Sequence, residues 1–143
     1  MTVPPTYYFE DLKEGMTETY TRVINDNDLH LFADCTGDNN PVHFDDAYAA
    51  GTRFKGRICH GMLVASLIST ALGTKMPGPG TVYVSQSLRF KAPVRPGDEV
   101  VARVTVTKLI PEKRFVEFET SCSVGGKVVL EGDATGLIPS RAA

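Results

Sequence analysis

The chain has 143 residues, enough for one domain with a core of its own and too few for two of ordinary size. Apolar residues make up 42% of it and charged residues 22%, a composition that excludes disordered, collagen-like and disulfide-scaffold proteins. The 15 basic and 17 acidic residues nearly cancel, which argues against a general attraction to nucleic acid. We therefore expect one domain over residues 1–143 that has no nucleic-acid partner.

Three features of the sequence bear on the compartment. The N-terminal segment carries Pro4, Pro5 and early acidic residues instead of the basic and then apolar stretch of a secretory signal. No apolar run reaches the roughly 18 residues that a membrane span needs. Cys35, Cys59 and Cys122 are widely spaced and odd in number, as in proteins that keep their thiols reduced. These features predict a cytoplasmic protein without a membrane partner.

The first half of the chain has helical and loop-like patterns. A helix is predicted over 26–35, because Asn25 is a good capping residue and the apolar positions that follow share one side. Gly37 and Pro41 forbid its continuation, and a short helical piece is expected over 45–50. The next predicted helix, 60–74, contains no aspartate, glutamate, lysine or arginine. A helix with no polar face must be surrounded, and this one is too short for lipid, so protein must wrap it.

From residue 81 onward, apolar residues alternate with polar ones, which is the period of a β-strand. Strands are expected over residues 82–90, 100–107, 116–124 and 128–138. Sequential strands usually pair, so the pattern predicts an α+β domain in which a curved antiparallel sheet wraps round the central apolar helix. Such a sheet has two free edges, and edge-to-edge pairing into a homodimer or a dimer-based oligomer is expected.

The loop between the first two helices concentrates residue types that carry chemistry. Asp38 and His43 lie five positions apart in a loop stiffened by Pro41. The two side chains could hold a water between them and act as acid and base. The structural alternative is that Asp38 only bonds its own backbone, because aspartate and asparagine beside glycine and proline form turns.

Gly61 stands at the start of the apolar helix, where unpaired backbone N–H groups and partial positive charge could stabilise an oxyanion on a thioester carbonyl. Without a side chain, glycine lets a ligand approach that backbone. Alternatively, Gly61 only relieves crowding between sheet and helix. The preceding His60 has two open interpretations, a direct role in the site or a local bond at the helix start.

Taken together, these segments resemble the MaoC-like (R)-specific enoyl-CoA hydratases over residues 9–138. The matching motifs, in chain order, are Asp38-x-Asn40-Pro41-x-His43, His60-Gly61-Met62-Leu63 and Ser87-Leu88-Arg89-Phe90-x-x-Pro93-Val94-x-x-Gly97-Asp98. Each motif alone is weak, whereas their combination is specific.

The resemblance implies a hot-dog fold and the reversible syn hydration of a trans-2-enoyl-CoA thioester to the (R)-3-hydroxyacyl thioester. It implies that Asp38 and His43 are the catalytic pair and that the Gly61 N–H binds the thioester oxygen. Asn40 would support the loop or touch the substrate, and Ser69 would lie near the thioester. No cofactor is implied, because coenzyme A is part of the substrate.

Further substrate contacts are predicted from residue type. A bulky Leu72 suits a short acyl chain if it faces the acyl tunnel. Basic residues could contact the phosphates of coenzyme A, although each is as readily a solvated surface residue. These residues are Arg53, Lys55, Arg57, Arg89 and Lys91. Cys59 and His60 diverge on a helix and have no further ligand at suitable spacing, so no metal site is predicted.

Three other functions compete with the hydratase interpretation. The same chemistry on acyl carrier protein would make a fatty-acid-synthesis dehydratase, which needs a basic docking patch. A hot-dog thioesterase would need a carboxylate on or near the central helix, and the segment 60–74 has none. A non-catalytic acyl-binding or scaffold subunit would have no need of the paired Asp38 and His43.

Overall fold

An antiparallel sheet of six strands carries the fold in the computed structural model, which describes residues 3–142. The strands are β1 (Thr17–Val23), β2 (Val82–Gln86), β3 (Arg89–Phe90), β4 (Glu99–Ile110), β5 (Phe115–Val124) and β6 (Lys127–Leu137). Their order across the sheet is β1-β4-β5-β6-β2, and β3 also pairs with β6.

Burial in the long strands follows the alternation that predicted them. The buried side chains are Val100, Ala102, Val104 and Val106 in β4, and Val116, Phe118, Thr120 and Cys122 in β5. Thr120 is the polar member of this set, and its hydroxyl donates to the Gly132 carbonyl (2.9 Å) and accepts from the Gln86 amide (2.9 Å). The core face is therefore apolar except where a hydroxyl has partners.

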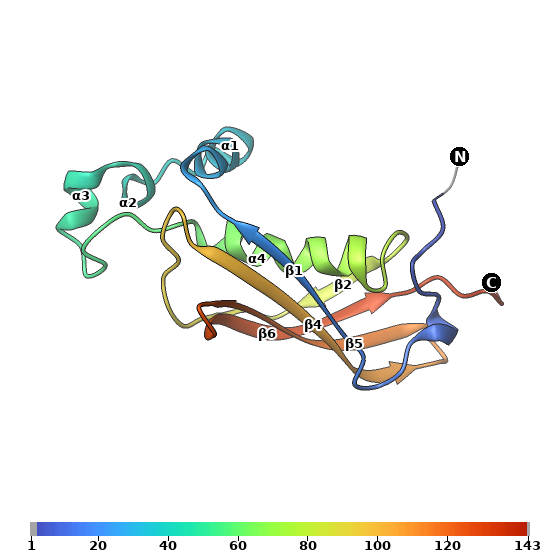
Figure 1. Ribbon diagram of the computed structural model, residues 1–143. Helices are drawn as coiled ribbons and strands as arrows, with labels where there is room; N and C mark the ends of the chain where they lie inside the picture. Colours follow the sequence, from blue (N-terminus) through green and yellow to red (C-terminus); the bar gives the residue numbers. More distant parts are fainter. Residues whose placement is uncertain (1–2, 143) are drawn as a thin grey trace.

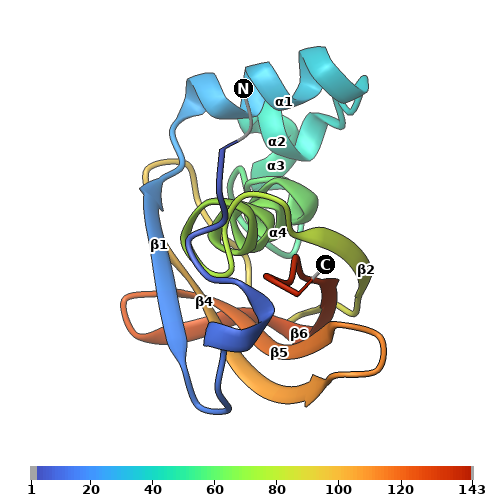
Figure 2. The ribbon, with the colours of Figure 1, turned by 90° about the vertical axis from the view of Figure 1, so that its right-hand side faces the viewer.

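The apolar helix lies in the concave face of this sheet, as predicted. It comprises α4 (Gly61–Thr70) and continues into a more widely wound segment, η2 (Ala71–Lys75). Figure 2 looks nearly along α4 and shows β1 on one side, β2 on the other and β4 to β6 beneath. None of the described helices is long and apolar enough to cross a membrane.

One prediction about this helix is wrong for the single chain. Protein was expected to cover α4 on every side, yet Met62, Ser66 and Ser69 are exposed. The sheet covers only the opposite side, where Val64, Leu67 and Ile68 are buried. Because these three residues are apolar or small, the sequence pattern predicted that surrounding protein would cover them.

Three helices precede α4: α1 (Asp26–Thr36), α2 (Pro41–Phe44) and α3 (Asp46–Ala50). In Figure 1, α2 and α3 lie beyond the end of the sheet at which α4 begins, and α1 lies above the start of α4. We call residues 26–58 the overhang. The predicted helix 26–35 is confirmed, and Asn25 caps it by accepting a bond from the Asp28 N–H (3.0 Å). The short helix predicted over 45–50 is α3, whereas α2 was missed, although Asn40 followed by Pro41 is a helix-start signal.

The sheet departs from the prediction at its edges. β1 was missed because its residues are exposed or half-buried and show no apolar pattern. Backbone pairing with β4 holds this strand in the sheet. The strand expected over 82–90 is two short strands, β2 and β3, and both pair with β6 instead of with β4, the next long strand in the sequence. The alternation in 82–90 predicts one apolar face made of Val82, Val84, Leu88 and Phe90. Leu88 is half-buried against the core, and the other three residues are exposed.

A second departure lies in β6. The alternation in the last strand predicts that Val128, Leu130, Ala134 and Ile138 share one face, and the last three are buried as expected. The register shifts between Cys122 and Ser123, and near this irregularity Val128 is exposed and Val129 is buried in its place.

Candidate active site

The loop that carries Asp38 folds through local hydrogen bonds. Gly37 ends α1 with a φ of 82°, a left-handed conformation that suits glycine. The Thr36 hydroxyl accepts from the Asp38 N–H (3.2 Å), and the Asn40 side chain accepts from the Val42 N–H (3.2 Å). Asp38 is exposed, and one of its carboxylate oxygens accepts a long bond from the Asn40 N–H (3.4 Å). The turn-forming interpretation of Asp38 is thus correct for one oxygen, and the second oxygen is left for chemistry.

His43, in contrast, is buried, with 7% of its surface exposed. Its Nδ1 lies 2.7 Å from the Ile58 carbonyl. A carbonyl only accepts, so in the neutral ring Nδ1 carries the proton and Nε2 is an acceptor. Burial holds the pKa of His43 below its ordinary value of 6.5; His60 acts in the same direction, while the Ile58 carbonyl and the Asp38 charge oppose it. His43 is therefore suited to accept a proton.

His60 joins these two residues. Its Nε2–H donates to the backbone carbonyl of Asp38 (2.9 Å), 22 positions earlier in the chain. Its ring stacks on His43, with centroids 3.9 Å apart and planes 29° apart. Asp38, His43 and His60 each contribute a nitrogen or oxygen atom to a group in which all atoms lie within 4.8 Å of one another. The fold thus brings together the three polar residues that the sequence pattern singled out.

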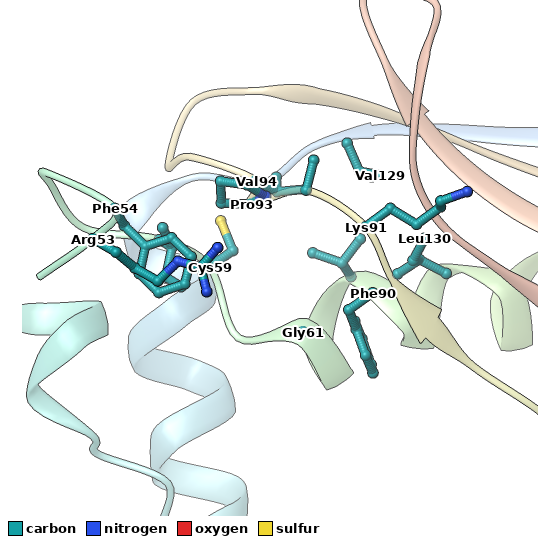
Figure 3. Close-up of a pocket in the computed structure, with 13 residues that line it drawn as sticks. Arg53, Phe54, Cys59, Gly61, Phe90, Lys91, Pro93, Val94, Val129 and Leu130 are labelled. Atoms are coloured by element: carbon teal, nitrogen blue, oxygen red, sulfur yellow. The ribbon is translucent and has the colours of Figure 1, made fainter.

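Gly61 follows His60 as the first residue of α4, and it borders a cleft of about 300 Å³. Figure 3 shows Gly61 at the first turn of the helix, with the Phe90 side chain of β3 beside it. A Cβ at Gly61 would lie 2.8 Å from Cε1 of Phe90, so the position has no room for a side chain while this ring stays in place. The crowding interpretation is supported by this contact, and the N–H groups of the first helical turn still lack partners within the helix.

The family follows from comparison with known proteins. The protein-family model described as "MaoC like domain" matches residues 9–128 of this chain. The chain belongs to the MaoC-like domain family. Its relatives in this family include an (R)-specific enoyl-CoA hydratase of Rhodospirillum rubrum, 56% identical over 135 residues that cover 94% of each chain. A 3-hydroxybutyryl-CoA dehydratase of Methylorubrum extorquens is 50% identical over 134 residues, covering 94% of this chain and 85% of that one.

A solved structure confirms the fold of this MaoC-like domain. The unliganded R-hydratase of Pseudomonas aeruginosa has a TM-score of 0.90 at 43% identity, covering 96% of this chain and 88% of its own. The expected hot-dog fold, a curved antiparallel sheet round a central helix, is therefore confirmed, and so is the family recognised from the three motifs.

Asn40 bonds both members of the Asp38–His43 pair, through its own N–H to the Asp38 carboxylate and through its carbonyl from the His43 N–H, whereas the other predicted site residues have different surroundings. Asn40 caps α2, the first of the two roles that the resemblance allowed. Ser69 is exposed in a groove between α4 and β2, and Leu72 is buried. Arg89 has 78% of its side chain exposed, lies 3.8 Å from Glu131 and does not border the cleft beside Gly61.

Two of the basic residues considered for the coenzyme A phosphates do border that cleft. Arg53 and Lys91 lie at its opposite ends in Figure 3. Cys59 also lines it, but burial raises the pKa of this thiol to about 12, which leaves it a poor nucleophile. The cleft is thus basic at its ends and apolar in between.

Sequence reasoning missed one participant in this MaoC-like domain. The Ile58 carbonyl fixes the tautomer of His43, and no sequence motif identifies a backbone carbonyl as a partner. The role of His60 was left open between a local bond and a direct role. Its side chain forms no cap bond at the start of α4, so the local interpretation is wrong.

Proposed function

We propose that this protein is an (R)-specific enoyl-CoA hydratase, a hydro-lyase that adds water reversibly to a trans-2-enoyl-CoA to give the (R)-3-hydroxyacyl-CoA. The observation that carries the proposal is the Asp38–His43 pair. The His43 Nδ1–H is held by Ile58, which leaves Nε2 as an acceptor, and a ring nitrogen of His43 lies within 4.8 Å of an Asp38 carboxylate oxygen. The named activities of the relatives, an (R)-specific hydratase and a 3-hydroxybutyryl-CoA dehydratase, are the two directions of this reaction type.

The mechanism follows from the chemistry of the three groups. The Gly61 N–H and the positive end of α4 polarise the thioester carbonyl, which makes the β-carbon electrophilic and stabilises an enolate-like transition state. A water held between Asp38 and His43 attacks the β-carbon and gives up a proton. A proton reaches the α-carbon on the same face, which gives syn addition. Asp38 and His43 together supply the acid and the base for these two proton transfers.

The substrate contacts proposed with this mechanism extend beyond the pair. Arg53 and Lys91 border the cleft beside Gly61 and are placed to approach the coenzyme A phosphates. We keep Ser69 near the thioester, Leu72 against a short acyl chain and Arg89 at coenzyme A as proposals of the family resemblance. No cofactor is needed, since acid, base and oxyanion donor are all supplied by the chain.

Purified protein and crotonyl-CoA test the proposal directly. Loss of the conjugated enoyl absorbance with formation of the (R) alcohol is expected. Asp38→Asn and His43→Gln are each expected to lower kcat by about 10²–10⁴-fold. Asp34→Asn is the matched control, because Asp34 is an exposed aspartate on α1. Wild-type rates in both site variants would contradict the assigned pair, and an (S) product would contradict the stereochemistry.

Other outcomes of this assay separate the competing functions. Turnover only with an enoyl group on acyl carrier protein would indicate the dehydratase of fatty-acid synthesis. Free thiol without alcohol would indicate a thioesterase. Binding without turnover of any thioester would indicate an acyl-binding subunit.

We also propose that the protein is a homodimer. The uncovered side of α4 and the short strands β2 and β3 carry exposed apolar residues, and β2 has a free edge. The large exposed apolar residues are Met62, Val82, Tyr83, Val84 and Phe90. A second copy would supply the protein cover that the apolar character of α4 requires. Sedimentation should give a dimer for the wild type and a monomer for Val84→Glu, and a monomeric wild type would contradict the proposal.

A cytoplasmic location is proposed alongside. It rests on the three cysteines, which are all free, and on a coenzyme A thioester as substrate.

A further inference from the structure

His60 is a buried imidazole in a position where an apolar residue would be expected. It is 2% exposed, lies at the N-cap of α4 and makes no capping bond there. Its Nδ1 is buried without a hydrogen-bond partner among the described residues. An unsatisfied buried polar atom costs free energy that a purely packing side chain would avoid. Filling space therefore does not account for an imidazole at this position.

The other nitrogen of the ring makes a contact with a defined direction. The Asp38 carbonyl can only accept, so the 2.9 Å contact requires the proton on Nε2 of His60. This bond holds the backbone of Asp38, the exposed catalytic carboxylate, to the residue that precedes Gly61. It thus joins the loop after α1 to the first turn of α4.

Aromatic rings also pack around the His60 imidazole. His43 stacks on it at 3.9 Å, Phe32 of α1 lies at 4.7 Å and Phe44 of α2 at 5.6 Å between ring centroids. One imidazole therefore contacts the catalytic histidine, the backbone of the catalytic aspartate and the two helices on either side of the Asp38 loop.

We propose that His60 is a positioning residue for the hydration reaction: its Nε2–H fixes the Asp38 backbone and its ring fixes the plane of His43, so that both groups reach one water. The inference rests on the proposed hydratase function. His60 acts through Asp38 and His43, and losing it should lower kcat while substrate binding at the cleft is largely retained.

Replacing the ring nitrogen and the ring separately tests this role. His60→Phe keeps an aromatic ring and removes the donor, and it is expected to lower kcat by about 10- to 100-fold while KM changes by less than about 3-fold. His60→Gln restores an amide donor at the reach of Nε2 and should recover most of the loss. His60→Asn, one methylene shorter, should not. Melting temperature and circular dichroism establish that each variant is folded.

The Gln and Asn pair decides the question if His60→Phe fails to fold, because the two side chains differ mainly in the reach of the donor. Long-range ¹H–¹⁵N NMR of the wild type gives a readout independent of activity, and the neutral ring of His60 is expected as the Nε2–H tautomer. Wild-type kcat in His60→Phe, equal kcat in His60→Gln and His60→Asn, or a proton on Nδ1 would overturn the inference. An inactive wild type would instead contradict the proposed function itself.

Discussion

The overhang and the three long strands β4 to β6 meet different physical demands within one chain. The strands bury an apolar face, with Thr120 as the polar exception among their buried side chains. In the overhang, residues 34–41 are all exposed, and capping bonds made by side chains hold the loop at Asp38. The core therefore lies between the sheet and α4, whereas the proposed catalytic pair is held by the overhang and its contact with the start of α4. Changes to one region should leave the readout of the other nearly unaffected.

Among the variants that compare these two regions, the largest loss of kcat is expected at Gly61, where the overhang meets α4. Gly61→Ala would place a Cβ 2.8 Å from the Phe90 ring, and either the ring or the start of α4 must move. Alanine keeps the backbone N–H, but its methyl group obstructs the approach of a thioester carbonyl to that donor, and loss of one oxyanion donor typically costs about 10²–10³-fold in kcat. Kinetics with crotonyl-CoA should show this loss with little change in melting temperature, because Phe90 is exposed and can shift.

Gly73→Ala is the matched control for that variant. Gly73 lies in η2, and a Cβ there would have no neighbour within 4 Å. Equal kcat in the two variants would contradict the role given to the Gly61 N–H.

A substitution at Gly132 in the sheet should instead lower stability and leave activity nearly unchanged. A Cβ on Gly132 would lie 1.8 Å from the Ser87 carbonyl oxygen, so Gly132→Ala must displace the backbone where β6 passes the segment between β2 and β3. Overpacking of this kind typically costs about 1–3 kcal/mol or more in free energy of unfolding. The melting temperature should fall by several degrees while kcat per folded molecule stays near that of the wild type.

Gly136→Ala in the same strand should cost less. Its Cβ would meet side chains at 3.3 Å and 3.4 Å, where small adjustments suffice. A kcat for Gly132→Ala that falls as far as that of Gly61→Ala would show that the two regions are not separable.

The pH dependence of kcat/KM for hydration should report on the overhang. Burial lowers the pKa of His43, so the ring stays neutral until the pH falls below its ordinary value of 6.5. The acid limb is therefore expected below pH 6.5, and His30→Asn, a change at an exposed histidine of α1, should leave it in place. Titration of the acid limb above pH 6.5 would contradict the assignment of His43.

The titration of His43 should also change the free energy of unfolding, which is expected to fall as the pH falls. A depressed pKa in the folded state means that the unfolded state binds the proton more readily. The contribution of His43 is present above its unfolded pKa and is lost as the pH falls through the folded value, so the wild type should lose more stability in this window than His43→Gln.

Chelator treatment should have the smallest effect, none at all on kcat. Asp38, His43 and His60 lie close enough to suggest a metal site. However, the Nδ1 of His43 and the Nε2 of His60 each bond a carbonyl, which leaves at most one nitrogen on each ring to bind an ion. Activity lost in EDTA and restored by a divalent ion would overturn the mechanism proposed for the overhang.

Much of the fold could be predicted because it depends on periodicity. The alternation in β4 and β5 and the unbroken apolar character of α4 are properties of neighbouring residues, and burial follows them. β1 was missed because an edge strand held by backbone bonds needs no apolar pattern. The exposure of Val82, Val84 and Phe90 was missed because the pattern shows which residues share a face, not whether this chain alone covers that face.

The candidate site also combines features that the sequence predicts with features that it does not. The sequence by itself determined the residue types and their local geometry, namely Asp38, His43 and a glycine at the start of an apolar helix, because capping and turn chemistry act over a few residues. Only the tertiary structure decided the partners of the two histidines, since Ile58 is 15 positions from His43 and Asp38 is 22 positions from His60. A hydrogen bond across such a distance depends on how the helices pack, and packing is decided by the whole chain.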